Sequence, residues 1–344
     1  MPKKILVIGG AGYVGSALVP KLLDEGHYVR VLDTFWFGKD VFDDYLRDNP
    51  KSRKQFVPIV GDIRDFDLKA VMGGMDTVIH LACISNDPSF ELNRNLGKSI
   101  NYDAFLRIIE AAQSRKAGRF IFASSSSVYG VKDAPNVTED MSLEPLTDYS
   151  KYKAFCEMEL QMIPIDVLPW VIIRPATVCG WAPRLRLDLT VNILTMAALT
   201  KGIITVFGGS QKRPNIHIDD MVDLYARLVN EPDEKILGQT FNAGGNNVSV
   251  MDIAFLVRRV AQKVKNTKIE IEVRPTNDLR SYHISSEKIK RELGWQTRRG
   301  VFDAVYDLIK AFDAGKIPNP DDPKYINIKT MQLLEQQARL FSTE

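Results

Sequence analysis

A short apolar segment near the start of the chain runs directly into a glycine-rich turn and then into a helical pattern. The sequence KILVI at residues 4–8 predicts a buried strand, and GGAGYVG at residues 9–15 opens the helix. The glycines fit two spacings, GxGxxG from Gly10 and GxxGxxG from Gly9, which share Gly12 and Gly15. Without Cβ atoms, such a turn lets backbone N–H groups approach a phosphate, to which the helix N-terminus adds partial positive charge. The feature confines the chain to folds that place a strand, an anion-binding turn and a helix in succession.

Short apolar runs alternate with helical periodicity through the first half of the chain. The runs lie at residues 5–8, 28–32, 56–60, 77–81 and 120–123. Strands that are apolar throughout, rather than alternating, indicate a parallel sheet covered by helices on both faces. We therefore predict an α/β fold, a Rossmann-like doubly wound parallel sheet with a smaller, mixed C-terminal substrate lobe.

Asp33 ends the second predicted strand and favours one dinucleotide over another. An acid at this place accepts hydrogen bonds from the hydroxyl groups of an adenosine ribose and repels a 2′-phosphate. No Arg or Lys occurs between Asp33 and Lys39 to receive such a phosphate. We predict NAD as the cofactor. The predicted contacts at this end are Gly9, Gly12, Tyr13, Val14, Gly15 and Asp33.

Two further strand ends belong to the predicted cofactor site. Asp62 and Ile63 close the third strand, where an acid can meet the adenine amino group, although a plain turn explains these residues equally well. Leu81 and Ala82 end the fourth strand, where small side chains leave room for a cofactor across the carboxyl edge of the sheet.

The regular pattern weakens after Pro175, where proline and glycine become frequent, and we place a boundary near Val178. The predicted parts are an NAD-binding domain at residues 1–178, to which residues 217–243 return, a substrate lobe at 179–216 and 244–320, and a helical tail at 321–344.

Composition narrows the possible partners. The 45 basic and 43 acidic side chains nearly cancel and are interspersed, so no net field attracts nucleic acid or anionic lipid. No apolar run approaches the roughly 18 residues that a membrane helix needs. Cys83, Cys156 and Cys179 show no CxxC spacing, which is typical of a reducing compartment and argues against a disulfide framework or a metal site. We expect a cytoplasmic protein that acts on small molecules.

The candidate chemistry follows the fifth strand. RFIFA at residues 119–123 leads into SSSSVYG, and Tyr149 and Lys153 follow on one face of a helix, four residues apart. A tyrosine with a solution pKa of about 10 is a poor base at neutral pH, but a nearby ammonium group and a positive nicotinamide ring favour the phenolate. We predict that Tyr149 carries a proton. The alternative is a YxxxK pair on a helix surface.

These motifs together resemble a known family. GGAGYVG, Asp33, GDIRD, HLA, SSSSVYG, YSKYK and FGGSQKRPNIHIDD resemble the extended short-chain dehydrogenase/reductases, especially the nucleotide-sugar 4-epimerases and 4,6-dehydratases. The resemblance extends over residues 4–295. It implies a tightly held NAD, a nucleotide-diphosphate sugar as substrate, a homodimer, and Ser125, Tyr149 and Lys153 as the catalytic residues.

The resemblance also implies a mechanism. Tyr149 takes the proton of the sugar 4-hydroxyl as C4 is oxidised to a ketone, while Lys153 holds the phenolate and Ser125 binds the same oxygen. Returning the hydride to the other face gives a 4-epimer, elimination gives a 6-deoxy-4-keto sugar, and release gives an oxidised product. Dehydratases of the family carry an Asp-Glu pair directly before VYG, where this chain has Ser126 and Ser127. Epimerisation or 4-oxidoreduction at C4 is therefore favoured over dehydration.

In the family, an aromatic residue before a glycine turn and an arginine after it hold the nucleotide. Phe207 and Arg213 match these positions, Arg280 resembles a second diphosphate-binding arginine, and Arg274 is an alternative to Arg280. The predicted substrate contacts are Ser126, Thr177, Phe207, Arg213 and Arg280.

Thr177 and Cys179 depart from the usual RxxNVYGP pattern of the family, which leaves the sugar open. Two other functions remain as alternatives to a nucleotide-sugar enzyme. One is a reductase of non-sugar carbonyl compounds, which would need neither Arg213 nor Arg280. The other is a non-catalytic NAD-sensing regulator, although such proteins usually lose the tyrosine or the lysine that this chain retains.

Overall fold

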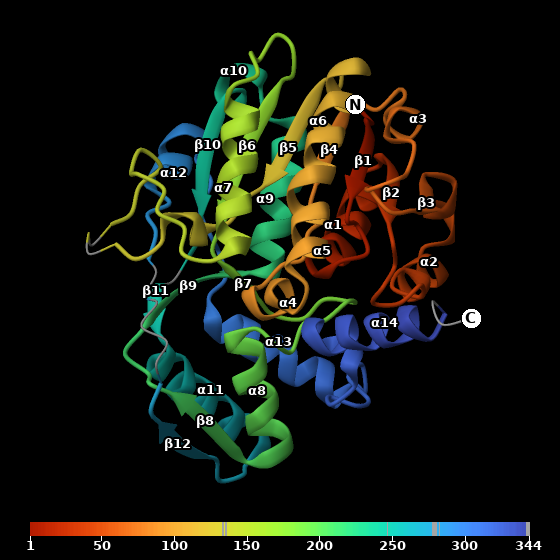
Figure 1. Ribbon diagram of the computed structural model, residues 1–344. Helices are drawn as coiled ribbons and strands as arrows, with labels where there is room; N and C mark the ends of the chain where they lie inside the picture. The colour runs from red at the N-terminus through yellow and green to blue at the C-terminus, as the bar shows by residue number, and fades with distance from the viewer. Residues whose placement is uncertain (133, 135, 246, 277–280, 282, 342–344) are drawn as a thin grey trace.

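The computed structural model describes residues 1–132, 134, 136–245, 247–276, 281 and 283–341. In this part of the chain, a seven-stranded parallel sheet lies between two layers of helices, and a smaller lobe extends from one end of it (Figure 1). The smaller lobe contains a mixed sheet, because its strand β11 runs antiparallel to β9 while β7 runs parallel to it. The predicted fold class is confirmed.

The large sheet has the strand order β10-β6-β5-β4-β1-β2-β3. The strands are β1 (Lys4–Ile8), β2 (Tyr28–Asp33), β3 (Phe56–Val60), β4 (Thr77–His80), β5 (Arg119–Ala123), β6 (Trp170–Pro175) and β10 (Gln239–Ala243). The chain winds outward from β1 through β2 to β3 and then returns to β4 on the other side of β1. Loops therefore leave β1 and β4 in opposite directions, which creates the crevice where open α/β sheets bind ligands.

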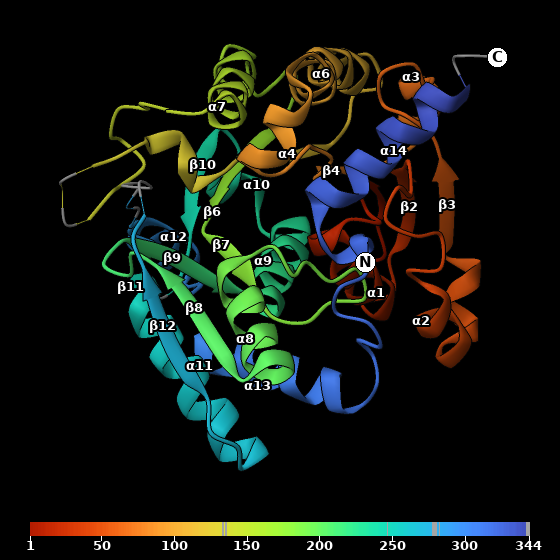
Figure 2. The ribbon, with the colours of Figure 1, turned by 60° about the horizontal axis from the view of Figure 1, so that its bottom comes forward.

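Successive residues of each strand supply two different cores. Ile5 and Val7 face α1 (Tyr13–Asp24) and α9 (Ile218–Asn230) within one apolar cluster. Leu6 and Ile8 belong to a second cluster on the opposite face. The helices of the second face are α3 (Leu68–Met72), α6 (Ala104–Ser114) and α7 (Asp148–Gln161), as Figure 2 shows. Each fully buried aliphatic side chain contributes about 1.5–3 kcal/mol, so both layers are held by apolar burial.

Residues late in the sequence rejoin the large sheet. β10 pairs with β6 in parallel, with Phe241 beside Ile173, and α9 packs against α1. The complete division of the chain into domains stays a prediction.

The smaller lobe has a core of its own. Its strands are β7 (Thr177–Cys179), β8 (Ile203–Phe207), β9 (Lys212–His217), β11 (Asn247–Ser249) and β12 (Glu270–Arg274). Its helices are α8 (Thr190–Lys201), α11 (Val250–Lys265) and α13 (Val301–Asp313), which contact one another around a third apolar cluster. β7 follows β6 directly, so the lobe begins at the carboxyl edge of the large sheet.

The remaining helices are α2 (Asp43–Asp48), α4 (Asp87–Leu92), α5 (Arg94–Lys98), α10 (Asp233–Ile236), α12 (Glu287–Leu293) and α14 (Asn327–Phe341). The C-terminal helix α14 packs against α4, which follows β4, so the two lie together at the carboxyl edge of the sheet (Figure 2). Among the described residues, no helix combines the length and the apolar character required to cross a bilayer.

Candidate active site

A cavity of about 500 Å³ lies at the carboxyl edge of the large sheet, between the glycine turn after β1 and the first turn of α7. The predicted site residues that line it are Gly9, Gly12, Tyr13, Val14, Gly15, Asp33, Asp62, Ile63, Leu81, Ala82, Ser125, Ser126, Tyr149, Lys153, Thr177 and Arg213. Phe207 is not among the lining residues, and Arg280 lies outside the described residues. The sequence motifs thus converge on one space although they are spread over most of the chain.

The glycine turn is shaped by close backbone approach. Gly9 has a φ of +83°, and a Cβ there would lie 2.4 Å from the backbone nitrogen of Ala82. A Cβ on Gly15 would lie 2.5 Å from the carbonyl oxygen of Gly10. At Gly12 the nearest atom would be the Gly9 carbonyl oxygen, at 3.2 Å, and no described side chain caps the helix that Gly12 starts. The first N–H groups of α1 are therefore available to a ligand anion.

Asp33 is held at the end of β2 by the backbone. Its two carboxylate oxygens accept hydrogen bonds from the N–H groups of Ala11, at 2.9 Å, and Phe35, at 2.8 Å. Burial raises the pKa of Asp33, and the two backbone bonds act in the opposite direction. Each oxygen keeps acceptor capacity toward the cavity, which suits the ribose hydroxyl groups of NAD. The open glycine turn and the buried acid fit this cofactor.

Asp62 lies at the opposite end of the predicted adenosine site and is bound by Arg64. The Arg64 guanidinium donates to both carboxylate oxygens of Asp62, at 3.0 Å from Nε to Oδ1 and 2.7 Å from Nη2 to Oδ2. Burial acts to raise the pKa of Asp62, but these bonds to Arg64 lower it overall. The carboxylate therefore stays ionised, and a bond to an adenine amino group would have to share it with Arg64.

Tyr149, Ser125 and Lys153 face the cavity from two adjacent elements. Thr147 and Ser150 form a capping box that starts α7, so Tyr149 lies in the first turn and Lys153 one turn later. Ser125 follows β5 and caps the short 3-10 helix Ser126–Tyr129. Burial raises the pKa of Tyr149, as does the neighbouring Cys83, whereas a hydrogen bond with Ser125 lowers it.

The Lys153 ammonium group is held at the end of β5. Its nitrogen donates to the carbonyl oxygen of Ala123 at 2.6 Å and lies 4.9 Å from the centre of the Phe122 ring. Burial raises the pKa of Tyr149, so the predicted phenolate depends on the positive nicotinamide ring as well as on Lys153.

A buried ion pair supports this part of the site from behind. Glu157, which is fully buried, accepts from Arg174 at 3.1 Å from Nε and 2.6 Å from Nη2. It also accepts a hydrogen bond from Ser124, next to Ser125. Glu157 lies one turn beyond Lys153 in α7, and Arg174 lies in β6. Glu157 therefore connects α7, which bears Tyr149, to β6 through Arg174 and to the end of β5, which bears Ser125, through Ser124.

The predicted substrate contacts are only partly brought together. Ser126, Thr177 and Arg213 line the cavity, and Arg213 also donates to the carbonyl oxygen of Lys212 at 3.0 Å. Phe207 ends β8 with 55% of its surface exposed, and its base-stacking role stays a prediction. Arg274, the alternative to Arg280, is paired with Glu272 at 3.1 Å.

Sequence reasoning missed a polar group in the cavity wall. Arg184 and Arg186 lie in the loop after β7, and Asn327 begins α14; all three are buried and line the cavity. The alternation of arginine and leucine in PRLRLDL was a usable signal, because a solvated loop has little reason to space its arginines between apolar residues. No local pattern marks Asn327, which reaches the site only because α14 folds back over α4.

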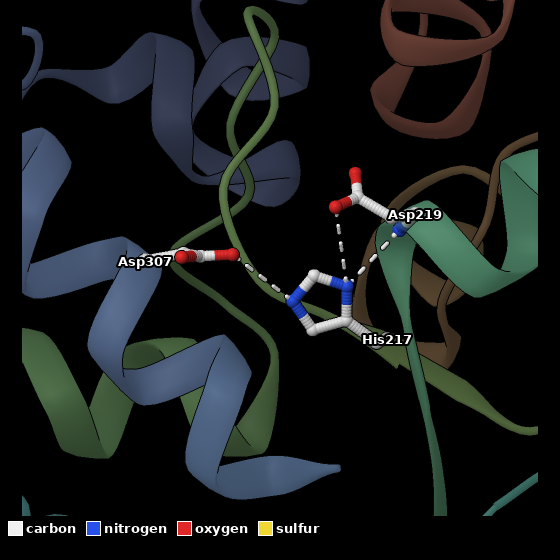
Figure 3. A group of neighbouring side chains, drawn as sticks. All are labelled: His217, Asp219 and Asp307. Carbon is white, nitrogen blue, oxygen red and sulfur yellow. Dashed lines mark hydrogen bonds and ion pairs between the residues drawn. The ribbon is translucent and has the colours of Figure 1, made fainter. Parts of the chain in front are cut away.

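A second cluster lies where the smaller lobe meets α9, outside the residues that line the cavity. His217, Asp219 and Asp307 offer ligand atoms within 4.8 Å of one another. Figure 3 shows the two carboxylates beside different nitrogens of the ring, with Nε2 3.3 Å from Asp307 and Nδ1 accepting from the Asp219 N–H at 3.1 Å. Arg299 also pairs with Asp219 at 3.4 Å. These contacts connect the end of β9 to the start of α9 and to α13.

The carboxyl edge of the sheet, its glycine turn and the Tyr149–Lys153 pair define an enzyme that holds its substrate beside a dinucleotide, as the extended short-chain dehydrogenase/reductases do. The model of the "NAD dependent epimerase/dehydratase family" matches residues 5–244. The chain belongs to this family and is an NAD-dependent enzyme.

Comparisons with individual proteins agree with this membership. YtcB of Bacillus subtilis, described as an uncharacterized UDP-glucose epimerase, is 34% identical over 75% of this chain and 82% of its own. A UDP-glucose 4-epimerase of Mycolicibacterium smegmatis is 29% identical over 90% of this chain and 98% of its own. The crystal structure of a Bacillus cereus UDP-glucuronic acid 4-epimerase with UDP-glucuronic acid and NAD is 27% identical, with a TM-score of 0.77 over 90% of this chain and 99% of that one.

Proposed function

We propose that the protein modifies a UDP-sugar through a 4-keto intermediate and that 4-epimerisation is the net reaction. The observation that carries the proposal is that Ser125, Tyr149 and Lys153 line the cavity that also contains the uncapped start of α1. The relatives of known description support the class of substrate, since their names specify UDP-sugars.

The protein groups would move the proton. The Tyr149 oxygen receives the proton of the sugar 4-hydroxyl group and later returns it to the same oxygen. Ser125, which lines the same cavity as Tyr149, would orient both oxygens and stabilise the charge that develops between them. Lys153, one turn along α7, adds positive charge near the phenol. NAD bound along the glycine turn would supply the acceptor and donor of the hydride at C4.

The absence of an acid pair after β5 supports epimerisation over dehydration. Elimination of water across C5 and C6 needs a proton donor and an acceptor close to the sugar. Where the family dehydratases carry Asp-Glu, this chain has Ser126 and Ser127, whose side chains are hydroxyl groups and not carboxylic acids. Ser127 is moreover within 2.9 Å of the Ser125 hydroxyl, so it takes part in the Ser125–Tyr149 arrangement.

The test is to incubate the purified holoenzyme with a panel of UDP-sugars and to follow the sugar signals by NMR. The proposal predicts a new 4-epimer, and it predicts that Tyr149→Phe retains NAD but forms no product. A 6-deoxy ketone would instead identify a dehydratase, and accumulated NADH with an oxidised sugar would identify a 4-dehydrogenase. Turnover retained by Tyr149→Phe would refute the assignment of the proton carrier.

UDP binding distinguishes the proposed function from the alternative, a reductase of non-sugar carbonyl compounds. Arg213→Ala should weaken UDP binding about tenfold, because a charge-assisted bond to a phosphate contributes about 1.5 kcal/mol or more. Lys201→Ala, at the end of α8, removes a cation that does not line the cavity and serves as the matched control. Equal UDP affinity in the wild type, Arg213→Ala and Lys201→Ala would favour the non-sugar alternative.

We also infer that the protein is a homodimer that associates through α7. Phe155, Met158 and Met162 lie on one exposed face of this helix, with 80% of Met162 accessible. An apolar face of this kind suits a partner helix. Met158→Glu should convert a dimer to a monomer in sedimentation experiments, whereas Phe302→Glu, at an equally exposed apolar position on α13, should not. A monomeric wild-type protein would contradict the inference.

A cytoplasmic location is supported by the thiols. Cys83, Cys156 and Cys179 are free, and two of them are buried in the cores. Proteins with unpaired buried cysteines fit a reducing compartment. Cell fractionation tests this location; recovery of the protein in an oxidising compartment would contradict it.

A further inference from the structure

A buried arginine lies beside the start of α1 and lines the cavity. The backbone N–H of Arg184 donates to the hydroxyl group of Ser16 in the first turns of α1, at 3.1 Å. Its side chain is only 5% exposed and lines the cavity, with the guanidinium carbon 3.7 Å from the centre of the Phe37 ring. Arg184 is thus placed between the helix that opens after the glycine turn and the segment that follows Asp33.

The guanidinium of Arg184 is incompletely satisfied. Nη2 donates to the side-chain oxygen of Asn327, whose own amide nitrogen donates to Ser85 at 3.1 Å. Nε is buried without a hydrogen-bond partner among the described residues. A buried guanidinium normally has its donors paired, because an unpaired one loses the solvation that water provided. The free donor therefore points to a missing acceptor in the cavity.

The neighbouring charges do not neutralise Arg184. Arg186 is paired with Asp188 at 2.9 Å and 3.1 Å, whereas no described carboxylate lies within ion-pair distance of Arg184. Burial, and then the positive charge of Arg186, lower the pKa of Arg184 to about 9. The uncapped N–H groups of α1 carry partial positive charge and line the same space. Asp188 and Asp33 also line the cavity and act in the opposite direction on the pKa of Arg184, but Asp188 is bonded to Arg186 and Asp33 to the backbone N–H groups of Ala11 and Phe35. The unpaired Nε of Arg184 and the start of α1 therefore leave room for a ligand anion.

We propose that Arg184 binds the pyrophosphate of NAD together with the N–H groups at the start of α1 and that Asn327 holds Arg184 in place for it. The glycine turn would contact the pyrophosphate through backbone N–H groups, and Arg184 would add a charged donor. Asn327 lies outside the part of the chain that the family model matches, so α14 would complete the cofactor site. The inference rests on NAD as the cofactor but not on the reaction.

The test measures binding rather than turnover. NAD dissociation from the holoenzyme is followed by dilution, and ADP-ribose, adenosine and UDP are measured by displacement or titration. Arg184→Gln should weaken NAD and ADP-ribose about 10- to 100-fold, as expected for loss of a charge-assisted bond, and should leave adenosine and UDP within about threefold. Arg184→Lys should restore part of the loss because it returns the charge.

Controls distinguish a ligand contact from a folding defect. Arg119→Gln removes a buried arginine at the other end of β5 that bonds Leu228, Glu231 and Asp233. It should lower the melting temperature without changing the ratio of NAD to adenosine affinity. Asn327→Leu should weaken NAD about threefold through its effect on Arg184.

Three results would overturn the proposal. If Arg184→Gln leaves NAD affinity unchanged, Arg184 does not bind the cofactor. If adenosine weakens as much as NAD, the residue has only a structural role. If UDP weakens while NAD does not, the anion belongs to the sugar nucleotide. None of these results bears on the product formed from a UDP-sugar, so they remain distinct from failure of the proposed function.

Discussion

Gly9 and Gly26 offer a matched pair for measuring what the glycine turn requires. Both have a φ of +83°, but a Cβ on Gly26 would meet nothing within 4 Å, whereas one on Gly9 would lie 2.4 Å from the nitrogen and 2.6 Å from the Cα of Ala82. Gly26→Ala should therefore cost only the left-handed backbone strain, about 1–2 kcal/mol. Gly9→Ala adds overpacking against a rigid backbone, about 1–3 kcal/mol more.

These free energies convert to measurable temperature shifts. With about 2.1 cal/mol/K of unfolding entropy per residue, a chain of 344 residues loses ~1.4 °C of melting temperature per kcal/mol. Gly26→Ala should lower the melting temperature by ~1–3 °C and Gly9→Ala by ~3–7 °C, as measured by calorimetry. Because the Gly9 turn must move away from Ala82, the second variant should also lose bound NAD. Equal shifts with equal NAD content would refute the close approach of the two segments.

Three further perturbations probe the groups around the cavity. Glu157→Gln leaves Arg174 buried without its counter-ion and should lower the free energy of unfolding by about 3–5 kcal/mol, as measured by chemical denaturation. The double variant Glu157→Gln with Arg174→Met should lose less than the sum of the two single variants, and additive losses would contradict the pairing. Burial, with a smaller effect of Lys153, lowers the pKa of His80 from 6.5 to about 3, so only the unfolded chain gains its proton as the pH falls below 6.5. Stability should drop by about 2–3 kcal/mol between pH 6.5 and 4.5, and His80→Leu should remove this part of the pH dependence; an unchanged profile would contradict it. Burial raises the pKa of Tyr149 above 10, and the ionisation of this residue can be followed as the difference in tyrosinate absorbance between wild type and Tyr149→Phe. The difference should appear only above pH 10 without NAD and at lower pH with NAD. The same titration curve in both conditions would contradict the role of the cofactor's charge.

Local sequence was sufficient for the parts of the site that depend on neighbouring residues. The strand, glycine turn and helix at residues 4–24 carry their signal within a short segment, and so does the pairing of Tyr149 with Lys153 on one helix face. Parallel strands bring their carboxyl ends to one edge, so Asp33 and Ser125 could be assigned to one site without coordinates.

The remaining features depend on tertiary contacts that no segment encodes alone. Asn327 reaches Arg184 only after α14 has packed against α4, and the two residues are far apart in sequence. The pKa of Tyr149 depends on how completely the loops bury it, which the YxxxK spacing does not specify. Phe207 matched a family position, yet its strand places it outside the cavity-lining set.

Deuterium tracing at C4 of the sugar tests the central claim, that Tyr149 and NAD act together on this carbon. The holoenzyme would be given a UDP-hexose labelled with deuterium at C4, and the label in the epimerised product would be followed by NMR. Removal of hydride from C4 and its return within one site predicts that the epimer keeps its deuterium at C4. Exchange of that deuterium with solvent, or inversion at another carbon, would contradict the account.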